Sequence, residues 1–303
     1  MSKQKWLIVV GGPTAVGKTA ACISLSQHFS APIVSADSRQ FYREMNLGTA
    51  KPSAEELAMA PHYFIDSLSI HDTYDVGQFE KDGLALIAQL HEQTDVVIAT
   101  GGSGLFLQVL CQGMDQMPDI APEIREQLSQ ELQTKGLEVL QEELKQVDPV
   151  YYQQVDLQNP QRVIRALEVF RGSGVPFSAF RKGEKAQRPF QVIKIGLERP
   201  REELYQRIDA RMDAMIAQGL FEEAEVLFPL RHLNALQTVG YSEIFGYLEG
   251  KYDKEEAIRL LKRNSRRYAK RQLTWFKKDV EIAWFSPLDG EGITTHIREK
   301  MDA

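Results

Sequence analysis

The stretch that decides the fold lies at residues 7–19, which read LIVVGGPTAVGKT. Its apolar start, residues 7–10, is rich in β-branched side chains and is typical of a buried strand. The rest matches the pattern G-x-x-x-x-G-K-[ST], in which backbone N–H groups and a helix N-terminus face an anionic ligand. The lysine adds a positive charge, and the last hydroxyl suits a magnesium ion shared with the phosphates. We therefore predict a phosphate-binding loop made of Gly12, Pro13, Thr14, Ala15, Val16, Gly17, Lys18 and Thr19.

Strand-like runs recur after this loop. They lie at 32–36 and 96–100, and helix-compatible segments separate them, including an amphipathic one at 76–93. This alternation is typical of a parallel α/β sheet. Two further strands are expected at 192–197 and 282–285. We predict an α/β fold with a P-loop NTPase-like parallel sheet core, an inserted helical domain and C-terminal helices.

The composition changes between residues 118 and 190. This segment has almost no β-branched runs, and its pattern predicts helices at 123–134, 137–145 and 160–170, joined by Pro and Gly. We therefore predict a helical domain, 118–190, inserted into a core of 1–117 together with 191–303. Later helices are expected at 202–218, 221–227 and 254–277, and the last twelve residues, which are polar, are expected to fray.

Length and composition exclude several classes of protein. The chain has 303 residues and 43% hydrophobic residues, as ordinary globular proteins do. It has no apolar run of about 20 residues and no recognisable signal peptide, so we expect no membrane span. Its two cysteines, Cys22 and Cys111, are too few for a disulfide framework or a four-ligand zinc site. We expect a cytoplasmic protein, and a monomer, since nothing in the sequence demands a partner subunit.

Charge is distributed unevenly along the chain. The net charge is −6, yet nine basic residues and no acidic one lie between Arg259 and Lys278. Seven of the nine recur at steps of three and four, which places them on one face of a helix: Arg259, Lys262, Arg263, Arg266, Arg267, Lys270 and Arg271. A cationic face releases counterions from a phosphate backbone whatever the net charge of the protein. The face predicts a nucleic-acid surface, and the alternative is a solvated surface helix.

Polar residues follow two more of the predicted strands. Asp37 comes after the second strand, and Gly101, Gly102 and Ser103 come after the third. Carboxyl ends of parallel strands share the crevice in which α/β sheets bind ligands. The carboxylate there is suited to bind magnesium, to orient a nucleophile or to accept its proton. Each feature alone also fits a helix cap or a tight turn, but three strand ends converging on one crevice favour a site.

Seven segments, taken in order, resemble the bacterial tRNA dimethylallyltransferases. They are GPTAVGKT at 12–19, DSRQFY at 37–42, GTAKP at 48–52, GGSGLF at 101–106, NPQRVIRALEVF at 159–170, TVGYSE at 238–243 and KRQLTWF at 270–276. In that family the prenyl group of dimethylallyl diphosphate moves to the exocyclic amine of the adenosine on the 3′ side of the anticodon. The resemblance implies that the loop holds a leaving diphosphate rather than ATP, with Mg²⁺ at Thr19, and that a tRNA anticodon stem-loop is the second substrate.

The resemblance also implies roles for single residues. Asp37 would be the general base, and Arg211 would grip the diphosphate. Ser103 stands where many members of the family have Thr and would keep the hydroxyl in the catalytic site. The residues implied to contact tRNA are Asp37, Ser38, Arg39, Gln40, Ser103, Arg125, Gln158, Asn159, Pro160, Gln161, Arg162, Gln237, Thr238, Val239, Gly240, Tyr241, Arg263, Arg267, Lys270, Arg271, Gln272 and Trp275. For Trp275, stacking on a base and burial as an anchor both stay open.

Three other functions compete with this prediction. A small-molecule P-loop kinase, with Asp37 activating a hydroxyl, leaves the basic helix unexplained. A nucleotide-dependent RNA-binding protein would need a magnesium-binding Asp at the end of a hydrophobic strand, where this chain has Thr100 and Gly101. Prenyl transfer to a free adenine nucleotide shares the first motifs, but the basic helix favours tRNA.

Overall fold

The computed structural model describes residues 4–303. They form two compact units. The first holds the residues up to Gln112 together with Gln187–Ala303, and the second is Gly113–Ala186. Each unit has a hydrophobic core of its own.

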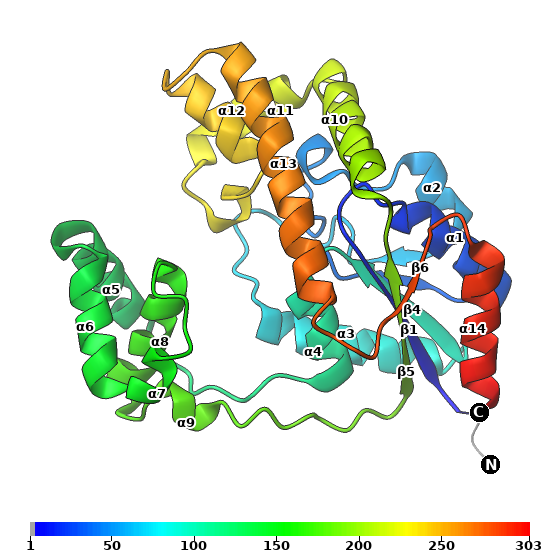
Figure 1. Ribbon diagram of the computed structural model, residues 1–303, viewed down its shortest axis with the longest axis horizontal. Coiled ribbons are helices and arrows are strands. Elements are labelled where there is room, and N and C mark those ends of the chain that lie inside the picture. Colours follow the sequence, from blue (N-terminus) through cyan, green and yellow to red (C-terminus); the bar gives the residue numbers. More distant parts are fainter. Residues whose placement is uncertain (1–3) are drawn as a thin grey trace. The chain divides into compact units, whose positions relative to one another are not determined.

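Among residues 4–303, six parallel strands form a single sheet in the first unit, in the order β3-β2-β4-β1-β5-β6 (Figure 1). The strands are β1 (Trp6–Gly11), β2 (Ile33–Ser35), β3 (His62–Tyr63), β4 (Val96–Gly101), β5 (Gln191–Leu197) and β6 (Ala283–Phe285). The predicted parallel α/β core and its five expected strands are confirmed. β3 was not predicted, because two residues are too short to show an alternation of apolar and polar side chains.

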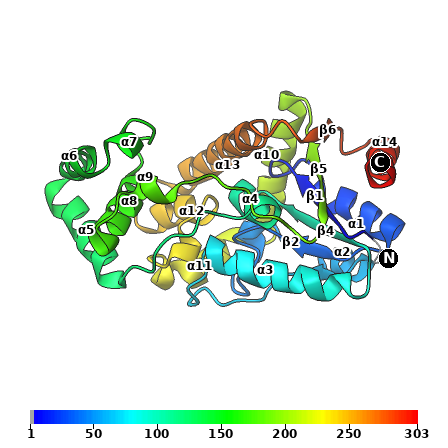
Figure 2. The same cartoon turned by 90° about the horizontal axis from the view of Figure 1, so that it is seen from below.

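Helices cover both faces of the sheet. Successive side chains of a strand point to opposite faces, and apolar side chains on both faces are buried by packing against helices. Ile8 and Val10 pack with α1 (Lys18–Phe29) and α14 (Gly290–Asp302), which lie side by side (Figures 1 and 2). Leu7 and Val9 pack on the other face with α3 (Val76–His91) and α4 (Gly104–Gln112). Both faces are therefore buried, and the carboxyl ends of the strands remain as the edge at which a site can form.

The prediction that the last twelve residues fray is wrong. All of them except Ala303 belong to α14, which Asp289 caps by accepting a hydrogen bond from the backbone N–H of Gly292. Ile293 and Ile297, four residues apart, are buried in the core beside α1. Two apolar side chains at helical spacing are enough to hold an otherwise polar helix in place.

A helical layer follows β5 in the first unit. It consists of α10 (Arg201–Ala217), α11 (Leu220–Leu227), α12 (Tyr241–Leu248) and α13 (Lys254–Phe276), with the 3-10 turns η2 (Phe228–Leu230) and η3 (Asn234–Leu236). Its apolar core also takes in Tyr42, Met45 and Ile70 from the segment after β2. That segment contains η1 (Leu47–Thr49) and α2 (Ala54–Met59). The layer is thus packed against the loops at the carboxyl end of the sheet.

The second unit contains only helices among its described residues. They are α5 (Pro122–Lys135), α6 (Leu137–Val147), α7 (Pro149–Tyr152), α8 (Pro160–Ser173) and α9 (Phe177–Phe180). Their core includes Leu128, Leu140, Leu144 and Leu167. The three helices predicted from the sequence in this segment correspond to α5, α6 and α8.

Within residues 4–303, no helix combines the length and the apolar character that crossing a lipid bilayer requires.

Candidate active site

The predicted phosphate loop joins β1 to α1. Its backbone turns through positive φ angles at Gly12 (153°), Ala15 (62°) and Gly17 (116°). A Cβ atom on Gly12 would lie 2.8 Å from the carbonyl oxygen of Leu197, so only glycine fits there. Gly17 precedes α1 without a side-chain cap, which leaves the N-terminal amides of the helix available to an anion.

Three side chains from distant helices and loops fasten this loop. Arg199 Nε donates to the carbonyl oxygen of Val16 (2.8 Å), and Arg207 Nε donates to that of Ala15 (2.9 Å). Gln272 Oε1 accepts a hydrogen bond from the backbone N–H of Thr14 (2.8 Å). No sequence pattern indicated the two arginines, because their partners are backbone carbonyls nearly two hundred residues away.

Two cations lie at the loop. Lys18 Nζ donates to the carbonyl oxygens of Gly12 (3.0 Å) and Pro13 (2.9 Å). Burial lowers the pKa of Lys18 to about 8; Arg211 lowers it further, and Asp37 opposes the shift. Arg211 donates from Nη1 to Thr14 Oγ1 (3.2 Å) and from Nη2 to the carbonyl oxygen of Ala50 (3.3 Å). These two bonds leave further guanidinium N–H groups for an anionic ligand.

The loop after β2 approaches the loop after β4 very closely. A Cβ atom on Gly101 would lie 2.5 Å from the carbonyl oxygen of Ala36, which explains why glycine stands there. Ser103 Oγ accepts a hydrogen bond from the backbone N–H of Ser38 (3.2 Å) and donates to Ser38 Oγ (3.1 Å). Asp37 Oδ1 accepts from the backbone N–H of Arg39 (3.1 Å). Ser103 therefore acts on the shape of the loop that carries Asp37.

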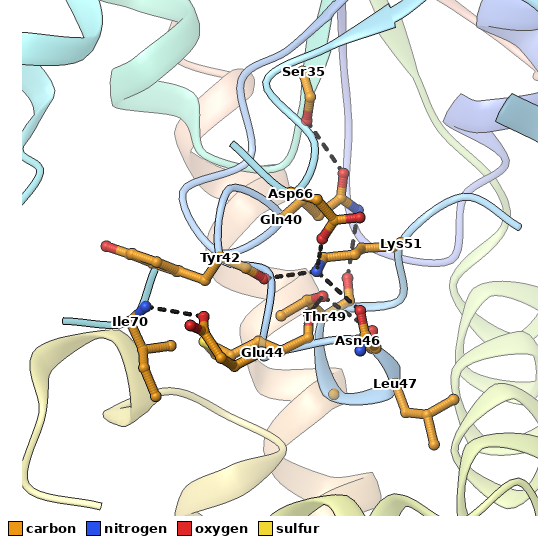
Figure 3. A network of polar contacts seen from close by, with 12 residues as sticks. Ser35, Gln40, Tyr42, Glu44, Asn46, Leu47, Thr49, Lys51, Asp66 and Ile70 are labelled. Carbon is orange, nitrogen blue, oxygen red and sulfur yellow. Dashed lines mark hydrogen bonds and ion pairs between the residues drawn. The ribbon is translucent and has the colours of Figure 1, made fainter. Parts of the chain in front are cut away.

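These elements line one pocket of about 760 Å³ in the first unit. Its lining includes Thr14, Lys18, Thr19, Asp37, Arg39, Gln40, Arg211, Thr238, Val239, Gly240 and Gln272. The phosphate loop and Asp37, which were expected at one crevice from the strand ends, thus share a cavity with Arg211, which was expected there only by resemblance. Gln40 also belongs to a polar network at the pocket (Figure 3): its amide donates to the carbonyl oxygen of Thr49 (3.4 Å). The same amide donates to the carbonyl oxygen of Ala50 (3.2 Å).

Tyr268 lines the pocket, although no sequence pattern indicated it. It comes from α13, one turn before Gln272. Burial raises the pKa of Tyr268 to about 12, and the negative charge of Asp37 adds to the shift. The phenol therefore stays protonated near neutral pH and can donate a hydrogen bond beside Asp37. Its place on a helix full of basic residues concealed it.

The basic face of α13 divides into two groups. Three of its cations are neutralised: Arg259 by Glu256 (2.6 Å), Lys262 by Asp213 (2.6 Å) and Arg266 by Asp209 (2.5 Å). Within residues 4–303, the other four form no salt bridge: Arg263, Arg267, Lys270 and Arg271. Three of these four cations, Arg267, Lys270 and Arg271, lie in the second half of the helix.

Two residues predicted to contact tRNA are buried instead. The Tyr241 side chain is 0% exposed, and its hydroxyl donates to Glu223 Oε1 (2.6 Å). Gln272 is 6% exposed, and its amide nitrogen donates to the carbonyl oxygen of Gly102 (2.9 Å). The Tyr241 side chain is thus enclosed by protein and both polar ends of Gln272 are already used inside the protein, while their contacts with tRNA stay predictions. Gln272 lines the pocket, whereas Tyr241 is not part of its lining.

Two adjacent aromatic residues at the end of α13 differ in their exposure to solvent. Phe276 is buried against Gly11, where an added Cβ would lie 2.7 Å from its ring. Trp275 is 39% exposed, although its indole lies over Gly104. Phe276 is therefore the packing anchor, and Trp275 keeps an accessible face. Gln237, also predicted to contact tRNA, is exposed and donates to the carbonyl oxygen of Arg231.

The remaining predicted tRNA contacts lie in the second unit. Asn159 caps α8 by accepting from the backbone N–H of Arg162 (3.3 Å), and Pro160 occupies its first turn. Arg125 pairs with Glu168 (3.0 Å) and donates to Gln161 Oε1 (2.9 Å). The segment 158–162 is thus an ordered helix start with exposed polar side chains, and Arg125 is engaged within the unit.

Comparison with known proteins identifies the family. A family model described as IPP transferase matches residues 40–279. The chain belongs to the IPP transferase family. This IPP transferase is 54% identical over 297 residues to the tRNA dimethylallyltransferase of Cytophaga hutchinsonii, covering 98% of each chain. It is 50% identical over 298 residues to that of Christiangramia forsetii, covering 98% of this chain and 99% of the relative.

Solved structures give the same result. The fold of this IPP transferase is similar to that of the full-length tRNA isopentenylpyrophosphate transferase of Bacillus halodurans, with TM-score 0.73 and 34% identity over 99% of this chain and 97% of the other. It is also similar to a eukaryotic dimethylallyltransferase acting on tRNA, with TM-score 0.76 and 25% identity over 92% and 74% of the two chains. The resemblance found in the sequence is confirmed, and the chain is a prenyltransferase.

Proposed function

We propose that this IPP transferase moves the dimethylallyl group of dimethylallyl diphosphate to the exocyclic amine of the adenosine on the 3′ side of the anticodon in tRNA. The products are N6-dimethylallyladenosine and diphosphate. One observation carries the proposal: Lys18, Arg211 and Asp37 line the same pocket, and α13 contributes to that pocket while its other face is basic. A phosphate cradle, a base and an RNA-binding surface thus belong to one unit.

The leaving group is held by the phosphate loop in this mechanism. As the bond between the allylic carbon and the diphosphate oxygen breaks, negative charge grows on the diphosphate. Lys18, Arg211 and the loop N–H groups are the donors that stabilise it. The loop backbone is fixed before the reaction by Arg199, Arg207 and Gln272, so little reorganisation of the loop is needed when the charge develops.

Asp37 is the general base of the proposed reaction. An aromatic amine is a poor nucleophile, so it must be held near the allylic carbon while its proton is removed. The new bond joins the amine nitrogen to that carbon, and the proton passes to the Asp37 carboxylate. Ser103 and Ser38 support this step by fixing the loop that carries Asp37.

An allylic cation must be protected from water, which would capture it. The pocket lining includes the apolar side chains Ile208, Met212, Met215 and Leu220. Met212, Met215 and Leu220 belong to the core of the helical layer. We assign to these side chains the exclusion of water around the prenyl group.

Magnesium fits the donor set of the pocket. Thr19 offers a hydroxyl at the phosphate loop, and Mg²⁺ commonly combines one or two protein oxygens with phosphate oxygens of a substrate. Within residues 4–303, no cluster of three His, Cys, Asp or Glu side chains is able to hold a metal by itself. Thr19 would therefore hold the ion together with the diphosphate, where it would neutralise the charge of the leaving group.

The acceptor adenosine has to leave the stacked anticodon loop before Asp37 can reach it. Extruding a base costs a few kcal/mol, which contacts to the rest of the RNA must offset. Arg263, Arg267, Lys270 and Arg271 supply uncompensated positive charge for those contacts. Ser38, Arg39 and Gln40 are the residues proposed to surround the extruded nucleotide, and the segment 158–162 is proposed to contact the RNA from the second unit.

One experiment tests the proposed reaction. The protein is incubated with unmodified tRNA, dimethylallyl diphosphate and Mg²⁺, and the nucleosides are then measured by mass spectrometry. We expect adenosine to gain one prenyl unit at the position next to the anticodon. No gain on tRNA, or a gain only on free adenine nucleotide, would contradict the proposal. ATP should displace dimethylallyl diphosphate no better than inorganic phosphate does, whereas strong displacement would favour a kinase.

A further inference from the structure

The turn η1 forms one wall of the pocket, and a single carboxylate holds it. Glu223, on α11, accepts hydrogen bonds from three successive backbone N–H groups: from Asn46 (3.2 Å) and Leu47 (2.9 Å) at Oε2, and from Gly48 (3.0 Å) at Oε1. These are the free amides at the start of η1. The carboxylate therefore caps a helical turn that lies about 175 residues away in the chain.

Tyr241 completes this arrangement. Its hydroxyl donates a fourth hydrogen bond to the Glu223 carboxylate (2.6 Å). Its ring lies directly against Gly48, where an added Cβ would lie 2.4 Å from the ring. The turn thus rests on an aromatic surface that is 0% exposed, while the carboxylate holds its amides. The tyrosine of the TVGYSE segment consequently has a structural partner that the sequence did not suggest.

The other end of the turn reaches Arg211. Ala50, the residue after η1, has a left-handed conformation (φ 51°), and its carbonyl oxygen accepts from Arg211 Nη2 (3.3 Å) and from Gln40 Nε2 (3.2 Å). Figure 3 shows Gln40 beside Thr49 and, next to them, Lys51 donating to the carbonyl oxygen of Tyr42 (2.6 Å) and to Asn46 Oδ1 (3.1 Å). Arg211 in turn donates to Thr14 in the phosphate loop.

We propose that Glu223 is a positioning residue for diphosphate binding: it holds η1 so that the carbonyl of Ala50 fixes Arg211 beside the phosphate loop. The inference rests on the proposed function in one respect, because there Arg211 stabilises the leaving diphosphate. Glu223 does not line the pocket, and it acts through η1. Residue types and spacing concealed it, because a glutamate in the first turn of a helix is also the ordinary choice beside a helix dipole.

The variant Glu223→Gln keeps the size of the side chain and removes its charge. An amide offers one acceptor oxygen and introduces an N–H₂ donor, so it cannot accept from three N–H groups and a phenol together. The matched control is Glu225→Gln on the same helix. Glu225 is exposed, and no hydrogen bond or ion pair of its side chain exists within residues 4–303.

The test measures the affinity of the whole protein for inorganic diphosphate by calorimetry. We expect Glu223→Gln to weaken binding by about tenfold and Glu225→Gln to leave it unchanged. In an Arg211→Ala background, Glu223→Gln should weaken binding less than twofold further, because the residue acts through the arginine. Independent losses that multiply in the double variant, or full affinity in Glu223→Gln, would overturn the proposal.

Amide hydrogen exchange keeps the proposal testable if the variant loses stability. Exchange at residues 46–48 should accelerate at least tenfold in Glu223→Gln while exchange in β1 and β4 stays at the wild-type rate. Equal acceleration throughout the first unit would mean general unfolding and would overturn a local role. Tyr241→Phe, which removes one of the four donors and keeps the ring, should change affinity in the same direction by a smaller factor.

Neither measurement uses prenyl transfer. If the protein binds diphosphate as described but never modifies tRNA, the proposed function fails and the role of Glu223 stands. If tRNA is modified and the Glu223→Gln variant binds diphosphate normally, the positioning proposal fails alone.

Discussion

The two faces of α13 differ in what surrounds them. One face contributes Ser265, Tyr268 and Gln272 to the pocket, and Gln272 bonds to the phosphate loop and to Gly102. The other carries Arg267, Lys270 and Arg271 into solvent. Residues one or two positions apart on this helix are therefore expected to act in different steps, either the chemical reaction or the binding of RNA. Substitutions on the buried face should change the chemical step, and substitutions on the exposed face should change the binding of RNA.

The largest effect is expected at the pocket itself. Asp37→Asn keeps the shape of the side chain and removes the proton acceptor, so kcat should fall by about 10²–10⁴-fold. The dissociation constant for tRNA should stay within about threefold of wild type, since one carboxylate is a small part of a large RNA surface. An equal loss of rate and of tRNA affinity would make Asp37 a structural residue and would erase the distinction between the two faces.

The second effect concerns Lys18. Lys18→Ala should lower kcat/KM for dimethylallyl diphosphate by about 10²-fold, because the variant lacks a preorganised donor to the leaving group. The wild-type kcat/KM should also fall as pH rises above about 8, because the lowered pKa of Lys18 lets the free enzyme lose this positive charge there. This fall of kcat/KM at high pH should be absent from the pH profile of Lys18→Ala. If the fall of kcat/KM persisted unchanged in Lys18→Ala, the ionisation would belong to another group.

A smaller effect is expected on the exposed face. Reversing the charge of Arg267 and Lys270 to Glu should weaken tRNA binding about tenfold or more at low salt. It should also reduce the slope of log Kd against log salt by about one unit for each phosphate group that the variant no longer neutralises. The rate at saturating tRNA should recover.

The ion-paired cations of the same helix provide the control for this variant. Lys262 and Arg266 already face Asp213 and Asp209, so charge-neutral substitutions, Lys262→Gln and Arg266→Gln, should change the salt slope much less than Arg267→Gln and Lys270→Gln. Equal changes in both pairs would show that the whole face contacts RNA and that its division into two groups has no meaning.

The features that were predicted correctly from the sequence depend on residues that lie close together in the chain. The phosphate loop needs a strand, glycines and a lysine in a fixed order, and all of them lie within 13 residues. The parallel strands carry β-branched runs that indicate burial on both faces. Asp37 and Ser103 were expected at the strand ends from the same pattern, although their catalytic roles came from resemblance alone and stay predictions.

Long-range contacts were beyond the sequence. Gln272 reaches the phosphate loop across 258 positions, and Glu223 reaches η1 across 175 or more. A buried glutamine looks like a surface contact when the helix around it is rich in basic residues, as α13 is around Gln272, whereas Tyr241 was assigned to the RNA surface by resemblance alone. α14 was missed because only two isoleucines provide its buried contact, and the composition of the segment as a whole remains polar.

The most direct test compares the two faces of α13 in one assay. Single-turnover prenyl transfer and the tRNA dissociation constant are measured for Gln272→Ala and for the Arg267→Glu, Lys270→Glu double variant. The account predicts a slow rate at saturating tRNA with unchanged affinity for the first, and weak affinity with a wild-type rate at saturation for the second. If both variants lose the same quantity, the separation of chemistry from RNA binding along this helix is contradicted.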